Sequence, residues 1–194
     1  PSPTASALET LAAAEAASAA RAAEFASADP DLLATLAALH AQRHAAATLL
    51  SNRAPTVPTD PVAGAAVEAL AAATAAASYL FDVVSARSGG AQRARSDATR
   101  EVLRRLRADQ VAGGSVPEGT IGHPLPFPVT TTADAARLAR EVVLTLRAGY
   151  GEHLGALAAS ESGAGLAAAT RWLGTVEVQA HRWGVALVPF PGLE

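Results

Sequence analysis

Few side chains in this sequence could do chemistry. Its 194 residues include five histidines, 18 acidic residues and no cysteine. His40 and His44 are four residues apart, a spacing that places two imidazoles on one helical face, where they can share a metal ion. Glu15 interrupts an apolar helical stripe, so its carboxylate needs a partner if it is buried. The three residues predict either a two-histidine, one-carboxylate metal site or, as we favour, a Glu–His hydrogen bond with the second histidine in solvent.

A second polar pair, Glu177 and His181, is also four residues apart and flanks an apolar stripe. Such pairs stabilise helices by about 0.2–0.5 kcal/mol without any catalytic purpose. The Glu-x-x-His spacing that carboxylate-bridged di-metal bundles require occurs nowhere in the sequence. We therefore expect no catalytic residue, no metal and no cofactor. The remaining candidates for an atypical metal site are Glu15, His40, His44, Glu177 and His181.

The segment from 91 to 112 carries six arginines, with Asp97 and Glu101 between them. A row of guanidinium groups on one helix could dock anionic headgroups, an acidic partner or nucleic acid. The whole chain, however, has a net charge of −3 and a pI near 6.0, and no aromatic residue lies among the arginines. We expect no binding of nucleic acid and favour a solvated helix face. The possible interaction face consists of Arg93, Arg100, Arg104 and Arg107.

The composition predicts an all-α protein. Half of the residues are hydrophobic but only 4% are aromatic, and alanine, the best helix former, is abundant, whereas strands favour branched and aromatic side chains. Ser6 and Glu9 predict a capping box, and Asp29 and Asp60 each precede a proline at a helix start. The expected helices cover 6–26, 30–50, 60–87, 91–112 and 131–159, with a sixth that follows the glycines at 163 and 165 and ends near 188.

The links between these helices predict their arrangement. A proline-rich crossover over 115–129 cannot be helical and is long enough to travel the length of a bundle. The links within successive helix pairs are short enough for hairpins, and two hairpins joined by one long crossover have the connectivity of ferritin-like bundles. We predict an up-down, ferritin-like four-helix core over 60–194, preceded by an N-terminal helical hairpin over 1–59 that packs on it or forms one continuous domain with it.

Apolar residues at helical spacing predict the core. One stripe comprises Leu8, Leu11, Ala22 and Phe25, and a second comprises Leu32, Leu36, Leu39 and Leu50. A third comprises Leu166, Ala169, Leu173, Val176, Ala180, Trp183 and Leu187. The apolar tail from 188 to 193 is expected to pack across the bundle end. No transmembrane span is expected, since Glu68 and Asp82 interrupt the most apolar stretch.

Two proline motifs and several single residues resemble a known family. Pro-Leu-Pro-Phe-Pro-Val at 124–129, Ala-His-Arg-Trp-Gly at 180–184 and Phe-Pro-Gly-Leu at 190–193, with Tyr79 and Tyr150, resemble an alanine-rich, ferritin-like family of unknown function from actinobacteria. The resemblance covers roughly residue 60 to the C-terminus. It implies a ferritin-like bundle, often in exported or lipid-anchored proteins. Thr74-Ala75, Gln92 and Leu144-Thr145 stand where the family often has Glu-His, His and Glu, so no metal ligand is carried over.

These observations favour a non-catalytic interaction or structural module without metal, whose partner is another protein or a second copy of the chain. We expect an extracytoplasmic location with association at a membrane surface, with a cytoplasmic location as the alternative. One other function is an atypical metal-binding or oxidoreductase bundle. Another is a carrier of a small apolar ligand, if layers of alanine leave a cavity in the bundle.

Overall fold

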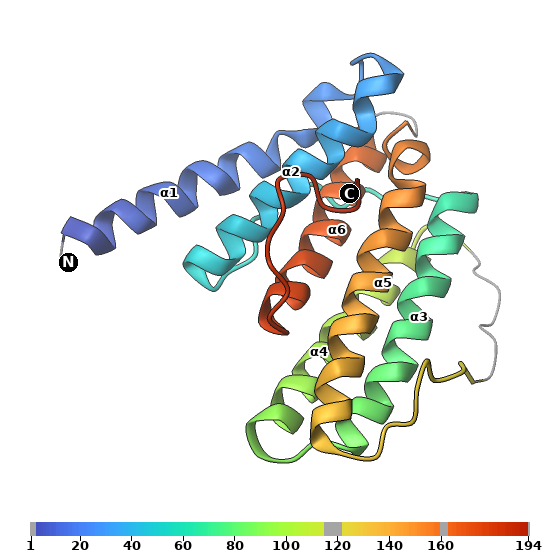
Figure 1. The fold of residues 1–194 in the computed structure, drawn as a ribbon. Helices are drawn as coiled ribbons and strands as arrows, with labels where there is room; N and C mark the ends of the chain where they lie inside the picture. The colour runs from blue at the N-terminus through green and yellow to red at the C-terminus, as the bar shows by residue number, and fades with distance from the viewer. Residues whose placement is uncertain (1–2, 115–121, 160–162, 194) are drawn as a thin grey trace.

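The computed structural model describes residues 3–114, 122–159 and 163–193, and every regular element in these ranges is helical (Figure 1). The prediction of an all-α protein is therefore confirmed. Part of the predicted crossover, 115–121, lies outside the described residues. The elements are α1 (Pro3–Ala20), the short 3₁₀ helix η1 (Ala22–Phe25), α2 (Pro30–Ser51), α3 (Ala65–Ala86), α4 (Gly90–Val111), α5 (Thr132–Ala158) and α6 (Ala164–Arg182).

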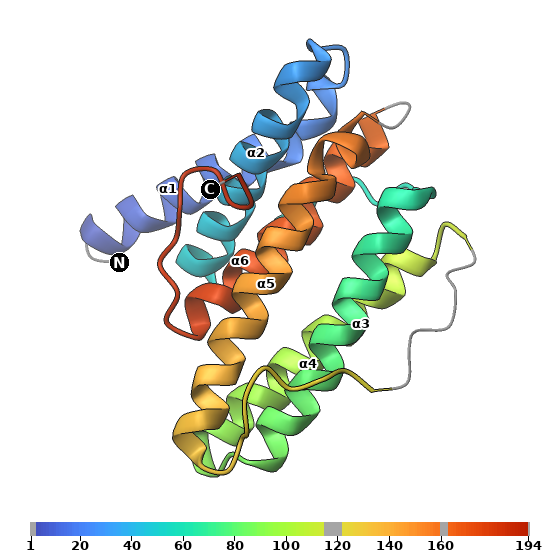
Figure 2. The same cartoon turned by 45° about the vertical axis from the view of Figure 1, so that its right-hand side comes forward.

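Helix α6 is the centre of the packing. It lies against α2 on one side and α5 on the other, while α5 continues to α3 and α3 to α4 (Figures 1 and 2). Fourteen of its 19 residues are buried, including Leu166, Trp172 and Leu173. Helix α1 packs on α2, and its N-terminal half projects beyond the other helices (Figures 1 and 2). The N-terminal hairpin thus joins the bundle through the contact of α2 with α6.

Local capping explains where α2 and α5 begin. The Asp29 side chain accepts a hydrogen bond from the backbone N–H of Asp31, and Pro30 occupies the first turn, as predicted. Thr131 caps α5 in a reciprocal capping box with Asp134. The Asp134 carboxylate accepts hydrogen bonds from Thr131 and Thr130, which lower its pKa to about 2.

Two predicted helix starts are wrong. Ser6 is not an N-cap, because α1 already begins at Pro3 and the Ser6 carbonyl accepts a hydrogen bond from the Thr10 hydroxyl within the helix. The first helix also ends at residue 20, where η1 replaces its last predicted turn. Asp60 does not start a helix either. The backbone has no regular structure from 60 to 63, and α3 begins at residue 65, directly after Gly64 with its φ of +117°.

The leucine stripes of the first two helices are only partly correct as core predictions: Ala22 is buried, and Leu36, Leu39 and Leu50 are half-buried, but other members are exposed. Leu8 and Leu11 on α1 are each 47% exposed, and Leu32 on α2 is 54% exposed. The buried face of α2 is instead formed by small residues and two histidines, because α2 packs closely on α6. That face comprises Leu33, Ala37, Ala38, His40, Ala41, His44, Ala45 and Ala47. The third stripe is buried as predicted except for Leu187, which follows the end of α6 and is 37% exposed.

The C-terminal tail packs across α5 through glycines. A Cβ added at Gly151 would lie 1.7 Å from the carbonyl oxygen of Gly192, so the two backbones touch. Pro191 is buried, and the Arg147 guanidinium donates to the carbonyl of Ala186 at 3.5 Å. The tail therefore packs on the helices, but Phe190 and Leu193 keep 43% and 41% of their surfaces exposed, so its apolar side chains are covered only in part.

Helix α3 is, among the described helices, the one long and apolar enough to cross a membrane by length and composition alone. Its most apolar window has a mean hydropathy of 1.5, and 39% of that window is buried against the rest of the chain. The helix packs against α4 and α5. A helix of a bundle core has the same composition, so this property carries no further conclusion.

We predict that Gly174→Ala will destabilise the protein by about 1–3 kcal/mol. A Cβ at this position would lie 2.7 Å from the His44 Nδ1 atom, so the added methyl group would push α2 and α6 apart. Urea denaturation measures the change. The matched control is Gly149→Ala on α5, where nothing lies within 4 Å of the added Cβ; its higher helix propensity should stabilise the protein by about 0.5–1 kcal/mol. Equal effects of both variants would contradict close packing at Gly174.

Candidate functional site

The interior of the bundle formed by α3, α4 and α5 holds a hydrogen-bonded group of neutral side chains. The Tyr150 hydroxyl of α5 accepts a hydrogen bond from the Gln110 amide of α4 and lies 2.9 Å from the Thr74 hydroxyl of α3. Thr74 also donates to the carbonyl of Leu70 at 2.8 Å. All three side chains are at most 1% exposed. Burial raises the pKa of Tyr150 far above its usual value, so its hydroxyl stays protonated.

The oxygen of the Gln110 amide is buried and has no hydrogen-bond partner among the described residues. It borders a cavity of about 20 Å³ whose lining also includes Val62, Gly64 and Glu68. This volume is enough for one water molecule. A water there would satisfy the amide oxygen.

Further hydrogen bonds join α4 to α6. Asp109 accepts from the indole N–H of Trp172 at 2.6 Å and from the Arg171 guanidinium at 2.8 Å. The Thr99 hydroxyl accepts from the indole of Trp183 at 3.0 Å and donates to the Gln179 amide oxygen at 3.1 Å. These bonds are made through long side chains, because the two helices approach each other at few points. The polar interior is thus organised to hold helices together.

The structure does not bring the five predicted metal candidates together. Within the described residues, no three His, Asp or Glu side chains form a group that could hold a metal ion. Glu15 pairs with Arg43, whose guanidinium donates to both carboxylate oxygens at 2.8 and 3.0 Å. The predicted Glu–His hydrogen bond is therefore wrong, because the arginine offers a charged donor from the facing helix. His40 instead lies with Nδ1 2.9 Å from the carbonyl oxygen of Ser18.

The second histidine is buried and not in solvent, which corrects the other half of that interpretation. His44 is 4% exposed, and its Nδ1 atom has no hydrogen-bond partner among the described residues. Burial, aided by the positive charge of Arg171, lowers its pKa to about 4. Glu177 is 1% exposed and pairs with the buried Arg147 at 3.5 Å, whereas His181 at the end of α6 is exposed. Glu177 and His181 therefore occupy different environments and do not form a pair in the interior.

The predicted arginine face is largely paired within the molecule. Arg100 contacts both Asp82 and Asp97, and Arg104 binds Glu101 at 2.8 Å. Arg93 is exposed beside Asp97, whose carboxyl pKa it helps to lower. Arg107 differs from the others, because its Nε atom is buried and has no acceptor in the part of the chain that the structure describes. That α4 docks a partner stays a prediction.

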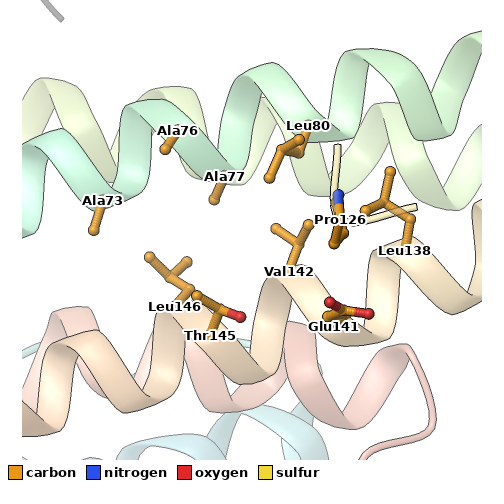
Figure 3. Close-up of a pocket in the computed structure, with 10 residues that line it drawn as sticks. All are labelled: Ala73, Ala76, Ala77, Leu80, Pro126, Leu138, Glu141, Val142, Thr145 and Leu146. Carbon is orange, nitrogen blue, oxygen red and sulfur yellow. The ribbon is translucent and has the colours of Figure 1, made fainter. Parts of the chain in front are cut away.

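An apolar groove with a volume of about 260 Å³ lies between α3 and α5 (Figure 3). Its α3 wall is made of Ala73, Ala76 and Ala77, whose small side chains leave the space open (Figure 3). The opposite wall and one end are formed by larger apolar residues. These are Leu80, Pro126, Leu138, Val142 and Leu146.

One edge of the groove is polar. Glu141 and Thr145 lie one turn apart on α5 and follow the same side of that helix (Figure 3). Glu141 is only partly buried. A ligand with its apolar part in the groove would therefore have a hydrogen-bond acceptor beside it for a polar end group. An apolar groove with a polar edge is suited to binding an amphiphile.

Residues 65–194 match the sequence profile of a domain of unknown function, DUF4439. The chain belongs to the DUF4439 family. No curated protein and no solved structure matched the chain. The family match covers the four helices α3 to α6 and the C-terminal tail, so the groove and the polar interior lie within the family domain.

Sequence reasoning anticipated a cavity from underfilled alanine layers but named none of the residues in it. The signal was present in the spacing of Ala73, Ala76 and Ala77, which places three small side chains on one face of a helix. The sequence alone does not show which helix packs opposite that face. The groove exists because α5 rather than α4 lies opposite these alanines.

We predict that Tyr150→Phe will lower the free energy of unfolding by about 1–3 kcal/mol, since the Gln110 amide would lose a buried acceptor. Thermal or urea denaturation measures the loss. Tyr79→Phe is the control, because Tyr79 is 41% exposed and its hydroxyl should contribute little. A neutral Tyr150→Phe would contradict the described hydrogen bonds.

We also predict a loss of stability in weak acid. The His44 pKa is depressed in the folded state, from 6.5 to about 4, so the unfolded chain binds a proton that the native state excludes. The contribution of His44 to the free energy of unfolding is therefore fully present above about pH 6.5. It falls by up to about 3 kcal/mol as the pH drops to 4. Denaturation at several pH values should show a smaller slope for His44→Gln than for wild type. His181→Gln, at an exposed site, should keep the wild-type slope; a slope unchanged in His44→Gln would refute the assignment.

Proposed function

We propose that this DUF4439 protein is a non-catalytic binding module with a ferritin-like bundle, and that it binds a single alkyl chain in the groove between α3 and α5. The observation that carries the proposal is the groove itself, with its alanine wall and apolar floor. Of the functions considered from the sequence, this supports the carrier of a small apolar ligand most directly. It also agrees with an interaction module, since a chain on a lipid or lipidated partner would be held in the same place.

The size of the groove argues for a chain of limited length. Pockets for drug-sized ligands have volumes of about 300–1,000 Å³, and this one has about 260 Å³. From Ala73 to Leu80 the groove follows α3 for about 10 Å at 1.5 Å per residue. An extended chain advances about 1.2 Å per bond, so eight to ten carbons fit. A folded partner helix would need a wider surface.

The polar edge argues for the kind of headgroup. The Glu141 carboxylate accepts hydrogen bonds and repels anions, and Thr145 offers a hydroxyl one turn away. A chain that ends in a hydroxyl, amide or ammonium group suits this edge better than a fatty acid anion does. We therefore commit to a neutral or cationic amphiphile as the ligand.

The setting of the protein belongs to the same proposal. The resemblance to ferritin-like actinobacterial proteins that are often exported or lipid-anchored supports an extracytoplasmic location at a membrane surface. An alkyl-binding groove would be useful there, since lipids supply such chains. A protein partner or self-association remains part of the proposal, without a named partner.

The test is an NMR titration of the protein with 1-nonanol and with nonanoate at pH 7. We expect 1-nonanol to shift the amide signals of α3 and α5 around the groove, and nonanoate to bind more weakly. Ala76→Leu adds three carbons inside the groove and should weaken 1-nonanol binding by about tenfold or more. Ala72→Leu is the matched control, because residue 72 is exposed on the same helix and does not line the groove.

Three results would overturn the proposal or its parts. Unchanged affinity in Ala76→Leu, or an equal loss in Ala72→Leu, would remove the groove as the binding site. Equal binding of nonanoate and 1-nonanol would remove the role of the polar edge. If that role is correct, Glu141→Gln should improve the binding of nonanoate.

A further inference from the structure

A second hollow lies on the other side of α3, between this helix and α4. Its volume is about 510 Å³, and it is lined by both apolar and polar side chains. The apolar part includes Leu103 and Val111 of α4. The polar part includes Ser78 and Tyr79 of α3 with Arg107 of α4. This mixture differs from the groove between α3 and α5, where apolar residues dominate.

Arg107 is the feature of this hollow that points to a ligand, because its guanidinium lines the hollow and makes no ion pair among the described residues. The Nε atom has no hydrogen-bond acceptor among those residues either, and it is buried out of reach, so a ligand would bind the terminal Nη groups. A buried donor without an acceptor is costly to a folded protein. The neighbouring Arg100 and Arg104 are already paired with carboxylates. Arg107 thus adds a positive charge to the hollow without an internal partner.

The acidic group of the hollow is already compensated. Asp82 lines it, and its carboxylate contacts the Arg100 guanidinium. Arg104, which also lines the hollow, is paired with Glu101. The two pairs cancel, so the unbalanced charge among the described lining residues is that of Arg107. The field in the hollow favours an anion.

Tyr79 supplies the rest of a recognition surface. Its ring is 41% exposed and meets the ring of His123 edge-on, with centroids 5.5 Å apart. An aromatic or apolar body could lie against this ring and Leu103, and Tyr79 and Ser78, which also line the hollow, carry hydroxyl groups that can donate hydrogen bonds.

We propose that the hollow between α3 and α4 binds a small organic oxyanion, a carboxylate or phosphate monoester on an aromatic or apolar body, through Arg107. The guanidinium holds the oxyanion with paired N–H donors, a geometry that lysine does not offer. The body of the ligand covers the Tyr79 ring and the apolar wall. This site is separate from the alkyl groove, so either can fail without the other.

The probes for the test are benzoate, phenyl phosphate and the neutral benzamide. Because the Arg107 Nε–H group is buried, its NMR signal can be followed directly during titration. We expect benzoate, phenyl phosphate or both to shift this signal, and the difference between them identifies the preferred oxyanion. Benzamide should bind at least about tenfold more weakly, since it lacks the charge. Added salt should weaken the binding of the anions.

Variants separate Arg107 from its neighbours. Arg107→Gln should lower the affinity for the bound anion by about tenfold, and Arg107→Lys should recover part of it because the charge is kept. Arg105→Gln is the matched control, since this exposed side chain of the same helix binds Glu101 and does not line the hollow. Thermal denaturation checks that each variant is folded. The proposal is overturned if neither anion binds, if benzamide binds equally well, or if Arg107→Gln and Arg107→Lys both leave the affinity unchanged.

Discussion

The close approach of α2 to α6 is the contact on which the rest of the structure depends. Gly174 has no side chain because the His44 ring occupies that space, and the face of α2 around it is largely alanine. Small residues let two helix backbones approach closely. Dispersion contacts between the backbones and small side chains then supply the packing that large side chains supply in an ordinary core. Helix α6 lies between α2 and α5, so α5 and the N-terminal hairpin pack directly on it, while α3 packs on α5 and α4 on α3. The same contact accounts for the buried, uncharged state of His44.

Small residues have the opposite effect between α3 and α5. Ala73, Ala76 and Ala77 face α5 across Val142 and Leu146, and there the helices do not close enough to fill the space. Alanine therefore creates tight packing in one interface and a groove in another. The difference lies in what the facing helix presents: glycine and alanine allow closure, whereas branched side chains keep the backbones apart. The abundance of alanine, which makes the sequence look uniform, is compatible with two distinct kinds of surface.

The elements of the fold could be predicted from the sequence, but several of their faces could not. Prolines, glycines and caps act locally, so they predicted the start of α2 at Asp29, but the same kinds of signal at Ser6 and Asp60 did not mark helix starts. The predicted buried face of α2 was wrong in part, because leucine and alanine are both apolar. Periodicity alone cannot tell that Leu32 is exposed while the alanines are buried. The partner of Glu15 depended on Arg43, 28 residues away, a contact that only the packing of α1 on α2 creates. The candidate site was missed for the same reason, since its walls come from helices far apart in the sequence.

The hydroxyl of Tyr150 has a mechanical consequence for the groove. Tyr150 lies one turn beyond Leu146 on α5, and its partner Thr74 follows Ala73 on α3, so both helices that border the groove are tied together immediately beside it. Gln110 adds a tie to α4. The width of the groove is thereby fixed before any ligand arrives, and a guest would meet a preorganised slot instead of one that must open. If the groove holds an alkyl chain as proposed, binding would cost little reorganisation, and the fixed width would admit a straight chain and reject a bulkier branched one.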